Sequence, residues 1–437
     1  MVKASNRTIW MTPLLIVLLL LVTVSGAKAA PMVRVGLTVG GSAVRIRGSG
    51  LLIDPNGNVV TEINNSNLNL TAGSGQVWLS DTPYSFLRAT PSSSGIDTYL
   101  QVNDKPYRGD LIISSSVGGI QVVNELGLED YLLGVVPQEM SPSWPLEALK
   151  AQAVAARTFT LKNMNKHHVD GFDLCDTSHC QVYGGVAAEH EATSIAVGDT
   201  AGLVLKYDGD LIDAYYHASS GGRTETAGAA WGQDRPYLTV VDEEVDLADP
   251  YAFWEVSFSS EELGERLGRA GYPVGPVERI EISKRTPSGR AASVFVQGVY
   301  GTAEIAGTRL RQVLNLRSTL FDIDGQTVGE EAVWQERQQV VALVQGRNNS
   351  FTTGVPSGTH VITTGGTVVL KSRTASGDIS RGKGKAEIIL QGRGYGHGVG
   401  MSQWGAKNLA ESQKEADKDI FVRILTHYYN GVTIEPY

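Results

Sequence analysis

Short runs in which hydrophobic and polar residues alternate dominate the first hundred residues after an N-terminal apolar stretch. Residues 33–38 and 43–47 alternate with a period of two, which is typical of half-buried strands. The segment 54–57 reads DPNG and carries the residues that β-turns need. The stretch 60–95 is rich in Ser, Asn and Thr, and we expect a loop-rich insertion there. Residues 30–120 are therefore predicted to form a β-rich N-terminal region.

A different pattern begins after this region and predicts helices. Residues 146–162 contain five alanines among larger apolar residues, so the predicted helix is apolar on most sides and should be buried. Pro145 precedes it, where the first turn of a helix tolerates proline. A short amphipathic helix is predicted over residues 261–270, and two more helices are predicted over residues 402–416 and 419–429.

The remaining segments return to strand patterns. Residues 195–245 and 276–322 read as short strands and turns, and an insertion at about 323–375 contains strand-like runs at 340–344 and 367–370. Strands and helices do not alternate regularly, which favours an α+β fold over a doubly wound sheet. The predicted fold is a mixed, β-rich core that encloses the alanine-rich helix.

The composition fits a folded, exported protein. The 437 residues are 42% hydrophobic and 19% charged, as in globular proteins of one large or two smaller domains. Residues 1–29 place Lys3 and Arg7 before an apolar run that ends near the small-residue site Ala27-Lys-Ala29. This pattern predicts a signal peptide, with an uncleaved membrane anchor as the alternative, because the run is just long enough to span a bilayer.

The charge balance narrows the range of partners. The net charge is −9 at pH 7, with 46 acidic and 37 basic residues. An acidic protein is a poor candidate for binding nucleic acid or anionic lipid, whereas binding to a weakly charged sugar polymer is compatible with it.

Two distant segments carry a family resemblance. Residues 131–140 read YLLGVVPQEM and continue into the alanine-rich helix, and residues 392–406 read GRGYGHGVGMSQWGA. Together they resemble the SpoIID/LytB family, which comprises the sporulation stage II protein D and the amidase enhancer. The resemblance covers residues 121–437 and implies a catalytic region that acts on peptidoglycan glycan strands. Residues 30–120 match it only loosely.

Glu139 is the candidate catalytic acid. It lies between Pro137 and Pro142, so it cannot be deep inside a helix. Its sequence neighbours are largely apolar, namely Val135, Val136, Met140 and Trp144. A carboxyl group among apolar side chains has a raised pKa and can act as an acid near neutral pH. The residues alone also allow an exposed loop glutamate. The resemblance implies that Glu139 is the catalytic residue.

The resemblance implies a lytic transglycosylase that cuts the β-1,4 bond between N-acetylmuramic acid and N-acetylglucosamine and leaves a 1,6-anhydro end. It also implies an alternative, a non-catalytic enhancer of a cell-wall amidase. The partners expected are therefore glycan strands and, in the second case, an amidase or another wall hydrolase.

Further residues are expected at this site. Arg157, in the alanine-rich helix, needs an acceptor if it is buried, and that acceptor is either a structural carboxylate or the substrate. The resemblance includes this arginine. It also implies substrate-binding residues: Gln181 and Tyr183 are expected to line the cleft, and Tyr215, Ser219 and Ser220 are expected to bond sugar. The alternate glycines of residues 392–400 allow close backbone approach to a glycan. This makes His397, Gln403 and Trp404 candidate substrate-binding residues of the cleft, with a purely structural glycine turn as the alternative. Trp231 reads either as a core residue or as a sugar-stacking face.

The two cysteines form a separate cluster with histidines. Cys175 and Cys180 flank His179, and His167 and His168 lie nearby. An exported protein can oxidise such a pair to a disulfide, the four side chains Cys175, His179, Cys180 and His168 can bind zinc, or the thiols are simply buried. Some relatives of the resembled family carry a zinc site of cysteine and histidine here, so a structural zinc ion is the expected cofactor.

Overall fold

The computed structural model describes residues 31–92, 99–323, 387–412 and 419–437, and the backbone of four strands between residues 339 and 369. Residues 32–437 form one compact unit, and the mixture of helices with several sheets confirms the predicted α+β class. The predicted signal or anchor at 1–29 lies outside the described residues. Within the described part, every helix is too short or too polar to cross a bilayer.

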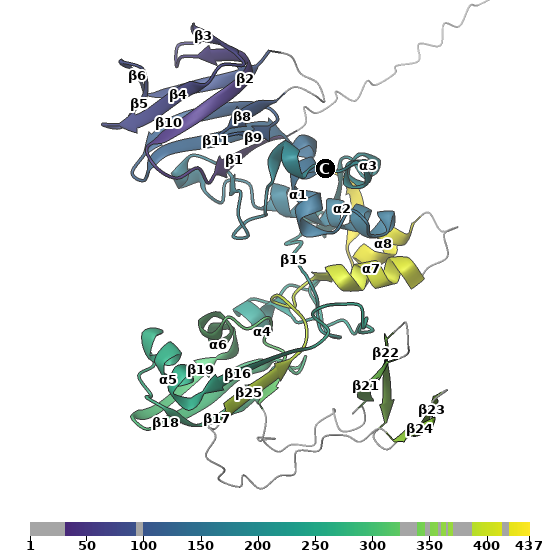
Figure 1. Cartoon of the computed structure of the whole chain (residues 1–437). Helices are drawn as coiled ribbons and strands as arrows, with labels where there is room; N and C mark the ends of the chain where they lie inside the picture. The colour runs from purple at the N-terminus through teal and green to yellow at the C-terminus, as the bar shows by residue number, and fades with distance from the viewer. Residues whose placement is uncertain are drawn as a thin grey trace, which may run out of the picture. The chain divides into compact units, whose positions relative to one another are not determined.

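A twelve-stranded sheet forms the N-terminal part of this unit (Figure 1). Its strands are β1 (Met32–Leu37), β2 (Ala43–Ile53), β3 (Val59–Asn64), β4 (Leu68–Gly73), β5 (Gln76–Leu79), β6 (Thr82–Tyr84), β7 (Phe86–Pro91), β8 (Leu100–Val102), β9 (Lys105–Tyr107), β10 (Asp110–Ser116), β11 (Gly119–Gly127) and β12 (Leu174–Cys175). The long strand β2 pairs with β4 and β8 before Ser49 and with β3 and β7 from that residue on. Gly48 at the change of partners has a φ of +137°, which favours glycine.

The expectation of a loop-rich insertion at 60–95 was wrong. Strands β3 to β7 occupy most of this stretch, and Ile63, Leu70, Val77 and Leu87 point into the core. The polar residues that suggested loops lie partly in the turns between these short strands and partly at strand positions outside the core. With at most two buried apolar residues in any of these strands, the signal was too weak to read from the sequence.

Helix α1 (Leu128–Glu139) follows β11 directly and covers the sheet. Its buried positions are Leu128, Tyr131, Leu132, Val135 and Val136, which recur every three or four residues along one face. Each fully buried Leu or Val contributes roughly 1.5–3 kcal/mol to folding. This face fixes α1 on the sheet and thereby sets the place of Glu139 at its end.

The alanine-rich helix α2 has the predicted bounds, Leu146–Lys162, and is buried along most of its length. Ala153 and Ala156 belong to the core of the N-terminal sheet, whereas Leu149 and Val154 belong to a second core. Small side chains let α2 pack closely on both sides. The other elements of this region are α3 (Glu191–Asp199), α4 (Ala227–Trp231), α7 (Gln403–Ser412), α8 (Ile420–Tyr428), β13 (Leu203–Tyr207), β14 (Asp210–Leu211), β15 (Tyr216–His217), β26 (Met401–Ser402), β27 (Thr433–Pro436) and the 3₁₀ turns His168–Asp170 and Gly185–Ala188.

A third hydrophobic core is formed by residues 254–323 together with the strand that precedes the glycine-rich motif. It contains β16 (Trp254–Ser259), α5 (Ser260–Arg269), β17 (Val277–Arg285), β18 (Ala291–Gly298), β19 (Gly301–Ala306), α6 (Gly307–Leu314), β20 (Phe321–Ile323) and β25 (Glu387–Gly392). Strand β25 lies between β16 and β20, so it carries the chain from this core into the glycine-rich motif. The helix predicted at 261–270 is confirmed as α5.

The predicted insertion at about 323–375 contains two antiparallel hairpins. Strands β21 (Gln339–Gln345) and β22 (Ser350–Pro356) form one, and β23 (His360–Thr363) and β24 (Gly366–Val369) form the other. The strand-like runs at 340–344 and 367–370 therefore coincide with β21 and β24.

Candidate active site

Glu139 is the last residue of α1, and the chain turns to an extended conformation at Met140. Pro137 lies in the final helical turn, where its ring and its missing N–H weaken the helix. The helix therefore ends where the two prolines indicated. The C-terminal end of a helix carries partial negative charge, which disfavours an ionised carboxylate and favours the neutral acid.

Three hydrogen bonds hold the Glu139 carboxyl group. The Tyr216 hydroxyl donates to Oε1 at 3.3 Å, the Gln403 amide donates to Oε2 at 3.2 Å, and the backbone N–H of Val182 also donates. Burial raises the pKa of Glu139 above its ordinary value, and the three donors offset this only in part. A protonated carboxyl group held in this way can serve as a general acid.

A pair of two-residue strands brings these partners together. In β15 and β26, Tyr216 pairs in parallel with Met401 and His217 pairs with Ser402. Helix α7 then begins at Gln403, which places this side chain beside the Tyr216 hydroxyl. The site thus joins three segments that are far apart in the sequence, and Glu139 and Gln403 are 264 residues apart.

Gln181 sets the direction of the hydrogen bonds that reach Glu139. Its Nε2 donates to the Tyr216 hydroxyl at 3.0 Å, so the hydroxyl proton is directed to Glu139. The Gln181 Oε1 accepts from Thr160 and Tyr131. Because Gln181 is buried, it orients Tyr216 and does not line an open cleft as expected.

Arg157 does not reach a substrate-accessible surface. Its side chain is 0% exposed, and its guanidinium group donates to both carboxylate oxygens of Glu129 at 2.8 and 2.6 Å. It also donates to the carbonyls of Leu203 and Val197. The structural ion pair is therefore the correct alternative, and the expected contact with substrate is not present, because protein acceptors surround the group.

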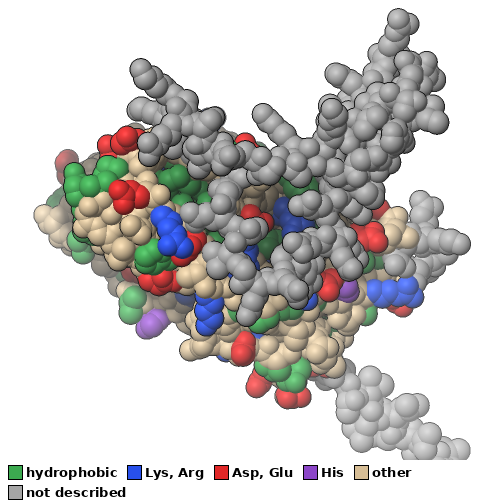
Figure 2. All heavy atoms as spheres, turned by 90° about the horizontal axis from the view of Figure 1, so that it is seen from below, with side chains coloured by type: hydrophobic (Ala, Val, Ile, Leu, Met, Phe, Trp, Pro, Cys, Tyr) green, Lys and Arg blue, Asp and Glu red, His purple; other side chains and the backbone are tan. Residues whose placement is uncertain are grey.

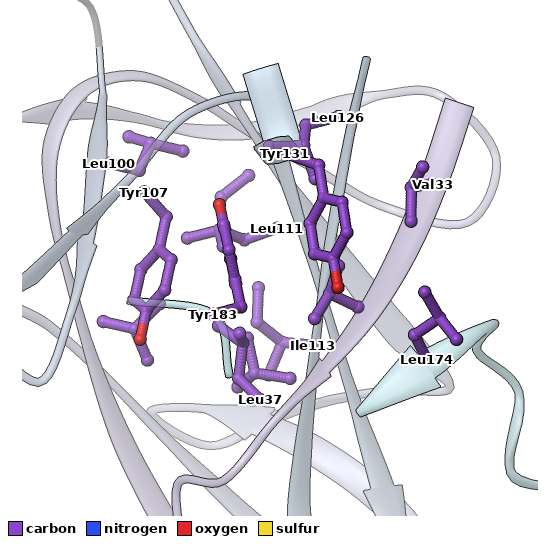
Figure 3. Close-up of a cluster of buried hydrophobic side chains, with 14 of the residues drawn as sticks. Val33, Leu37, Leu100, Tyr107, Leu111, Ile113, Leu126, Tyr131, Leu174 and Tyr183 are labelled. Atoms are coloured by element: carbon purple, nitrogen blue, oxygen red, sulfur yellow. The ribbon is translucent and has the colours of Figure 1, made fainter. Parts of the chain in front are cut away.

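Tyr183 is likewise a core residue. Its ring lies 5.1 Å from that of Tyr131 and 6.0 Å from that of Tyr107, among the buried side chains of Figure 3. Its hydroxyl donates to Asn124 Oδ1 at 2.9 Å. A Cβ on Gly134 would lie 2.6 Å from this ring, so the glycine permits α1 to approach Tyr183. The expectation that Tyr183 lines the cleft was wrong.

Ser219 and Ser220 were expected to bind sugar and instead bind buried carboxylates. The Ser219 hydroxyl donates to Asp249 Oδ2 at 2.5 Å, and the Ser220 hydroxyl donates to Glu243 Oε2 at 2.7 Å. Both serines are buried. Burial raises the pKa of Glu243 to about 7, although Ser220 and other hydrogen bonds lower it. This arrangement fixes the Ser-Ser-Gly-Gly turn to the loop at 243–249.

The remaining expected residues are partly accessible. Tyr215 and His397 are half-buried, and their rings lie 6.3 Å apart. Burial, Arg311 and Arg290 lower the pKa of His397 to about 3, so its imidazole is neutral at pH 7. Trp404 packs edge-on against Trp144 at 4.9 Å, directly after the Gln403 that contacts Glu139.

A cluster of four metal-ligating side chains lies where the cysteine motif predicted one. The donor atoms of His167, Cys175, His179 and Cys180 all lie within 4.8 Å of one another. Four of these distances, namely His167–His179, His167–Cys180, His179–Cys175 and His179–Cys180, run from 3.3 to 3.6 Å. Tetrahedral zinc, with ligand distances of about 2.1 Å to nitrogen and about 2.3 Å to sulfur, separates its ligand atoms by about 3.3–3.8 Å. The four residues therefore fit zinc.

The fourth expected ligand was wrong by one position. His168 bonds the carbonyl of Asn165, whereas His167 joins the cluster. The other ring nitrogen of His167 contacts the Asp170 carboxylate at 3.1 Å, which is the carboxylate–histidine arrangement common behind zinc ligands. Both cysteines are free in this structure.

The amino-acid sequence of this chain is similar to those of several known proteins. The family model SpoIID, described as stage II sporulation protein, matches residues 116–207. Stage II sporulation protein D of Bacillus amyloliquefaciens is 30% identical over 330 residues, which cover 71% of this chain and 75% of that protein. The amidase enhancer of Bacillus subtilis (strain 168) is 33% identical over 312 residues, which cover 70% of this chain but 40% of that protein.

The chain belongs to the SpoIID/LytB family. An uncharacterized protein of Brachyspira hyodysenteriae is also similar, with 32% identity over 352 residues that cover 79% of this chain and 74% of that protein. The segment that matches the SpoIID model contains Glu139 and all four residues of the metal-ligating cluster. Tyr216 and Gln403, which hold the Glu139 carboxyl group, lie outside this segment, so tertiary contacts complete the site.

Sequence reasoning missed two residues at this SpoIID/LytB site. Tyr216 contacts Glu139, although its neighbour Tyr215 was the one predicted to be at the site. Successive strand residues point to opposite faces. This rule indicates that only one of the two tyrosines faces Glu139, but it does not say which one. Gln152 accepts a hydrogen bond from Gln403 at 3.4 Å. The sequence predicts burial along most of the helix that contains Gln152, so nothing in it distinguished this residue as part of the site.

Proposed function

We propose that this protein is a lytic transglycosylase that cleaves the β-1,4 bond between N-acetylmuramic acid and N-acetylglucosamine in peptidoglycan glycan strands. The observation that carries this proposal is the half-buried Glu139, whose pKa is raised by burial and whose two oxygens each accept a hydrogen bond from a side chain. The similarity to stage II sporulation protein D supports it.

In the proposed reaction Glu139 acts first as an acid and then as a base. The protonated carboxyl group gives its proton to the glycosidic oxygen as the bond from that oxygen to the muramyl anomeric carbon breaks. The resulting carboxylate takes the proton of the muramyl 6-hydroxyl while that oxygen bonds to the anomeric carbon. The products are a 1,6-anhydro end and a free N-acetylglucosamine end, no water is consumed, and Glu139 returns to its protonated state.

The surroundings of Glu139 suit a mechanism with one carboxylate. Ordinary glycosidases use two carboxyl groups that flank the bond. Here the hydrogen-bond partners of Glu139 are a hydroxyl, an amide and a backbone N–H. Tyr216 and Gln403 stabilise the carboxylate once it forms, because both donate to it. Tyr215, His397 and Trp404 are the expected residues that remain accessible for contact with sugar.

The test is digestion of purified glycan strands, with and without stem peptides, by the full chain. Mass spectrometry separates an anhydro end from a hydrated reducing end by the mass of one water. We expect anhydro ends from the native protein and none from Glu139→Gln. Glu278→Gln, a change at an exposed carboxylate on β17, is the matched control and should cleave normally. Cleavage by Glu139→Gln at the native rate would refute the proposal.

A second candidate function is enhancement of a cell-wall amidase without catalysis. The 33% identity to a protein named amidase enhancer favours it, and the partner would then be a wall amidase. The two functions differ in their need for Glu139, because an activator tolerates Glu139→Gln. If glycan strands remain uncut, we expect the native protein and Glu139→Gln to stimulate an added amidase equally.

We also propose that His167, Cys175, His179 and Cys180 hold a structural zinc ion. The fit of their donor atoms to tetrahedral zinc and the Asp170 contact support this. Zinc would tie the loop at 167–180 together, and the next residues, Gln181 and Val182, contact Tyr216 and Glu139. The metal would thus act on the site only by holding these neighbours in place.

The proposed substrate lies outside the cytoplasmic membrane, and the N-terminal segment predicted for export would deliver the protein there. The surface is compatible with a weakly charged polymer. On the face shown in Figure 2, acidic and basic side chains are interspersed among polar and hydrophobic ones. The net charge of −9 opposes binding to nucleic acid.

A further inference from the structure

Trp231 is a large aromatic side chain that remains 47% exposed although it belongs to a packed ring cluster. Its ring lies 4.8 Å from Tyr215 and 5.1 Å from His397. Single exposed aromatic residues are common and need no explanation. A tryptophan that two other rings hold in place and that still stays about half exposed is different, because its exposed part suits a ligand with an apolar face.

A chain of ring contacts links this cluster to Glu139. Tyr216, whose hydroxyl bonds Glu139, lies 6.3 Å from Phe159, and Phe159 lies 6.3 Å from Tyr215. Tyr215 then contacts Trp231. Phe159, a largely buried residue, contacts both tyrosine rings, so these side chains form one connected aromatic cluster. The glycine-rich motif also links the two places, because it supplies both His397, which contacts Trp231, and Gln403, which bonds Glu139.

The backbone around Trp231 is fixed on several sides. The short helix α4 is capped by the Thr226 hydroxyl, which accepts from the N–H of Ala229. The N–H of Gly228 donates to Asp234, and the N–H of Glu225 donates to the carbonyl of Gly398 in the glycine-rich motif. These bonds hold the tryptophan against the same motif that supplies His397. A rigid aromatic face loses little conformational entropy on binding.

We propose that Trp231, supported by Tyr215 and His397, is a sugar-binding platform that holds a peptidoglycan glycan strand some sugars away from the bond at Glu139. The apolar face of a pyranose ring stacks on the indole. The platform rests on the proposed glycan-cleaving function and extends it, because it makes the protein select long strands over short fragments.

The test compares Trp231→Ala, Trp231→Phe and the control Tyr300→Ala, which removes a 77% exposed aromatic residue from the turn between β18 and β19. All three are made in the full chain carrying Glu139→Gln, so that the glycan stays intact. Binding is measured to purified peptide-free glycan strands and to a disaccharide of the same repeat. Thermal unfolding verifies that each variant is folded.

We expect Trp231→Ala to weaken binding to long strands about tenfold, as the loss of one aromatic contact implies. Binding of the disaccharide at the Glu139 site should not change, Trp231→Phe should retain most of the affinity, and Tyr300→Ala should match the parent. In a cleaving protein, Trp231→Ala should raise KM with kcat nearly unchanged.

The results also separate this platform from the proposed catalysis. If the native protein cuts no glycan but long-strand binding still depends on Trp231, the catalytic proposal fails and the platform stands. If Trp231→Ala binds and cleaves long strands as the parent does, the platform is refuted while the catalysis stands. Loss of amidase stimulation in Trp231→Ala with unchanged glycan binding would also refute the platform, because Trp231 would then contact a protein.

Discussion

Replacement of Arg157 by methionine should destabilise the protein without acting on substrate. Arg157 is fully buried and donates four hydrogen bonds, two to the Glu129 carboxylate and two to backbone carbonyls. Breaking a buried ion pair on one side costs about 3–5 kcal/mol, because the remaining charge loses its partner. The Glu129 side chain is 31% exposed, so water offsets part of this loss. We expect a cost of about 3 kcal/mol.

Urea unfolding of the native protein and of Arg157→Met measures this cost. The matched control is Arg266→Met, which breaks an exposed pair between Arg266 and Glu262 one helical turn apart and should cost less than about 1 kcal/mol. The double variant Glu129→Leu with Arg157→Met should recover part of the stability, since no unpaired charge is left. An Arg157→Met protein that is as stable as the native one but fails to bind glycan would refute the reasoning.

Three further predictions concern titration, the tyrosine at the site and metal. The pKa of Glu243 is about 7 in the folded state and lower in the unfolded state. Between these two pKa values the folded state binds more protons than the unfolded state. The free energy of unfolding therefore falls as pH rises to about 7. Glutamine does not titrate, so the free energy of unfolding of Glu243→Gln, measured with urea, should rise by about 2 kcal/mol relative to that of the native protein as pH increases from about 5 to about 8. Tyr216→Phe removes a donor that lowers the pKa of Glu139, so cleavage should be slower but persist to higher pH, and an unshifted pH profile would contradict this. Metal analysis should find about one zinc ion per chain, and Cys175→Ser should lose the metal and lower the thermal midpoint.

Local patterns predicted the elements whose signal lies within one segment. The helix at 146–162 has the predicted bounds because its composition and its preceding proline act within the segment itself. The stretch 60–95 was misread because each of its strands buries few apolar residues, and pairing with β2, β7 and β10 supplies the rest of the stabilisation.

The site was predictable in part. The family resemblance indicated Glu139, and Gln403 was among the expected substrate-binding residues. Only the pairing of β15 with β26 shows that Tyr216 and Gln403 approach the carboxyl group from separate segments. The identity of a polar residue in a motif does not reveal the direction in which its side chain points. Ser219 and Ser220 proved to be anchors of a loop for this reason.

By itself the sequence determined the class of the fold, the main helices and the location of the metal-ligating cluster, because these depend on local periodicity and on residue types close together in the chain. The candidate acid followed from the motifs that carry the family resemblance. Only the tertiary structure decided that Arg157 has a protein partner, that His167 and not His168 joins the cysteines, and that burial raises the pKa of Glu139. Each of these depends on the direction of a side chain and on its removal from water, and both are set by contacts between segments far apart in the chain.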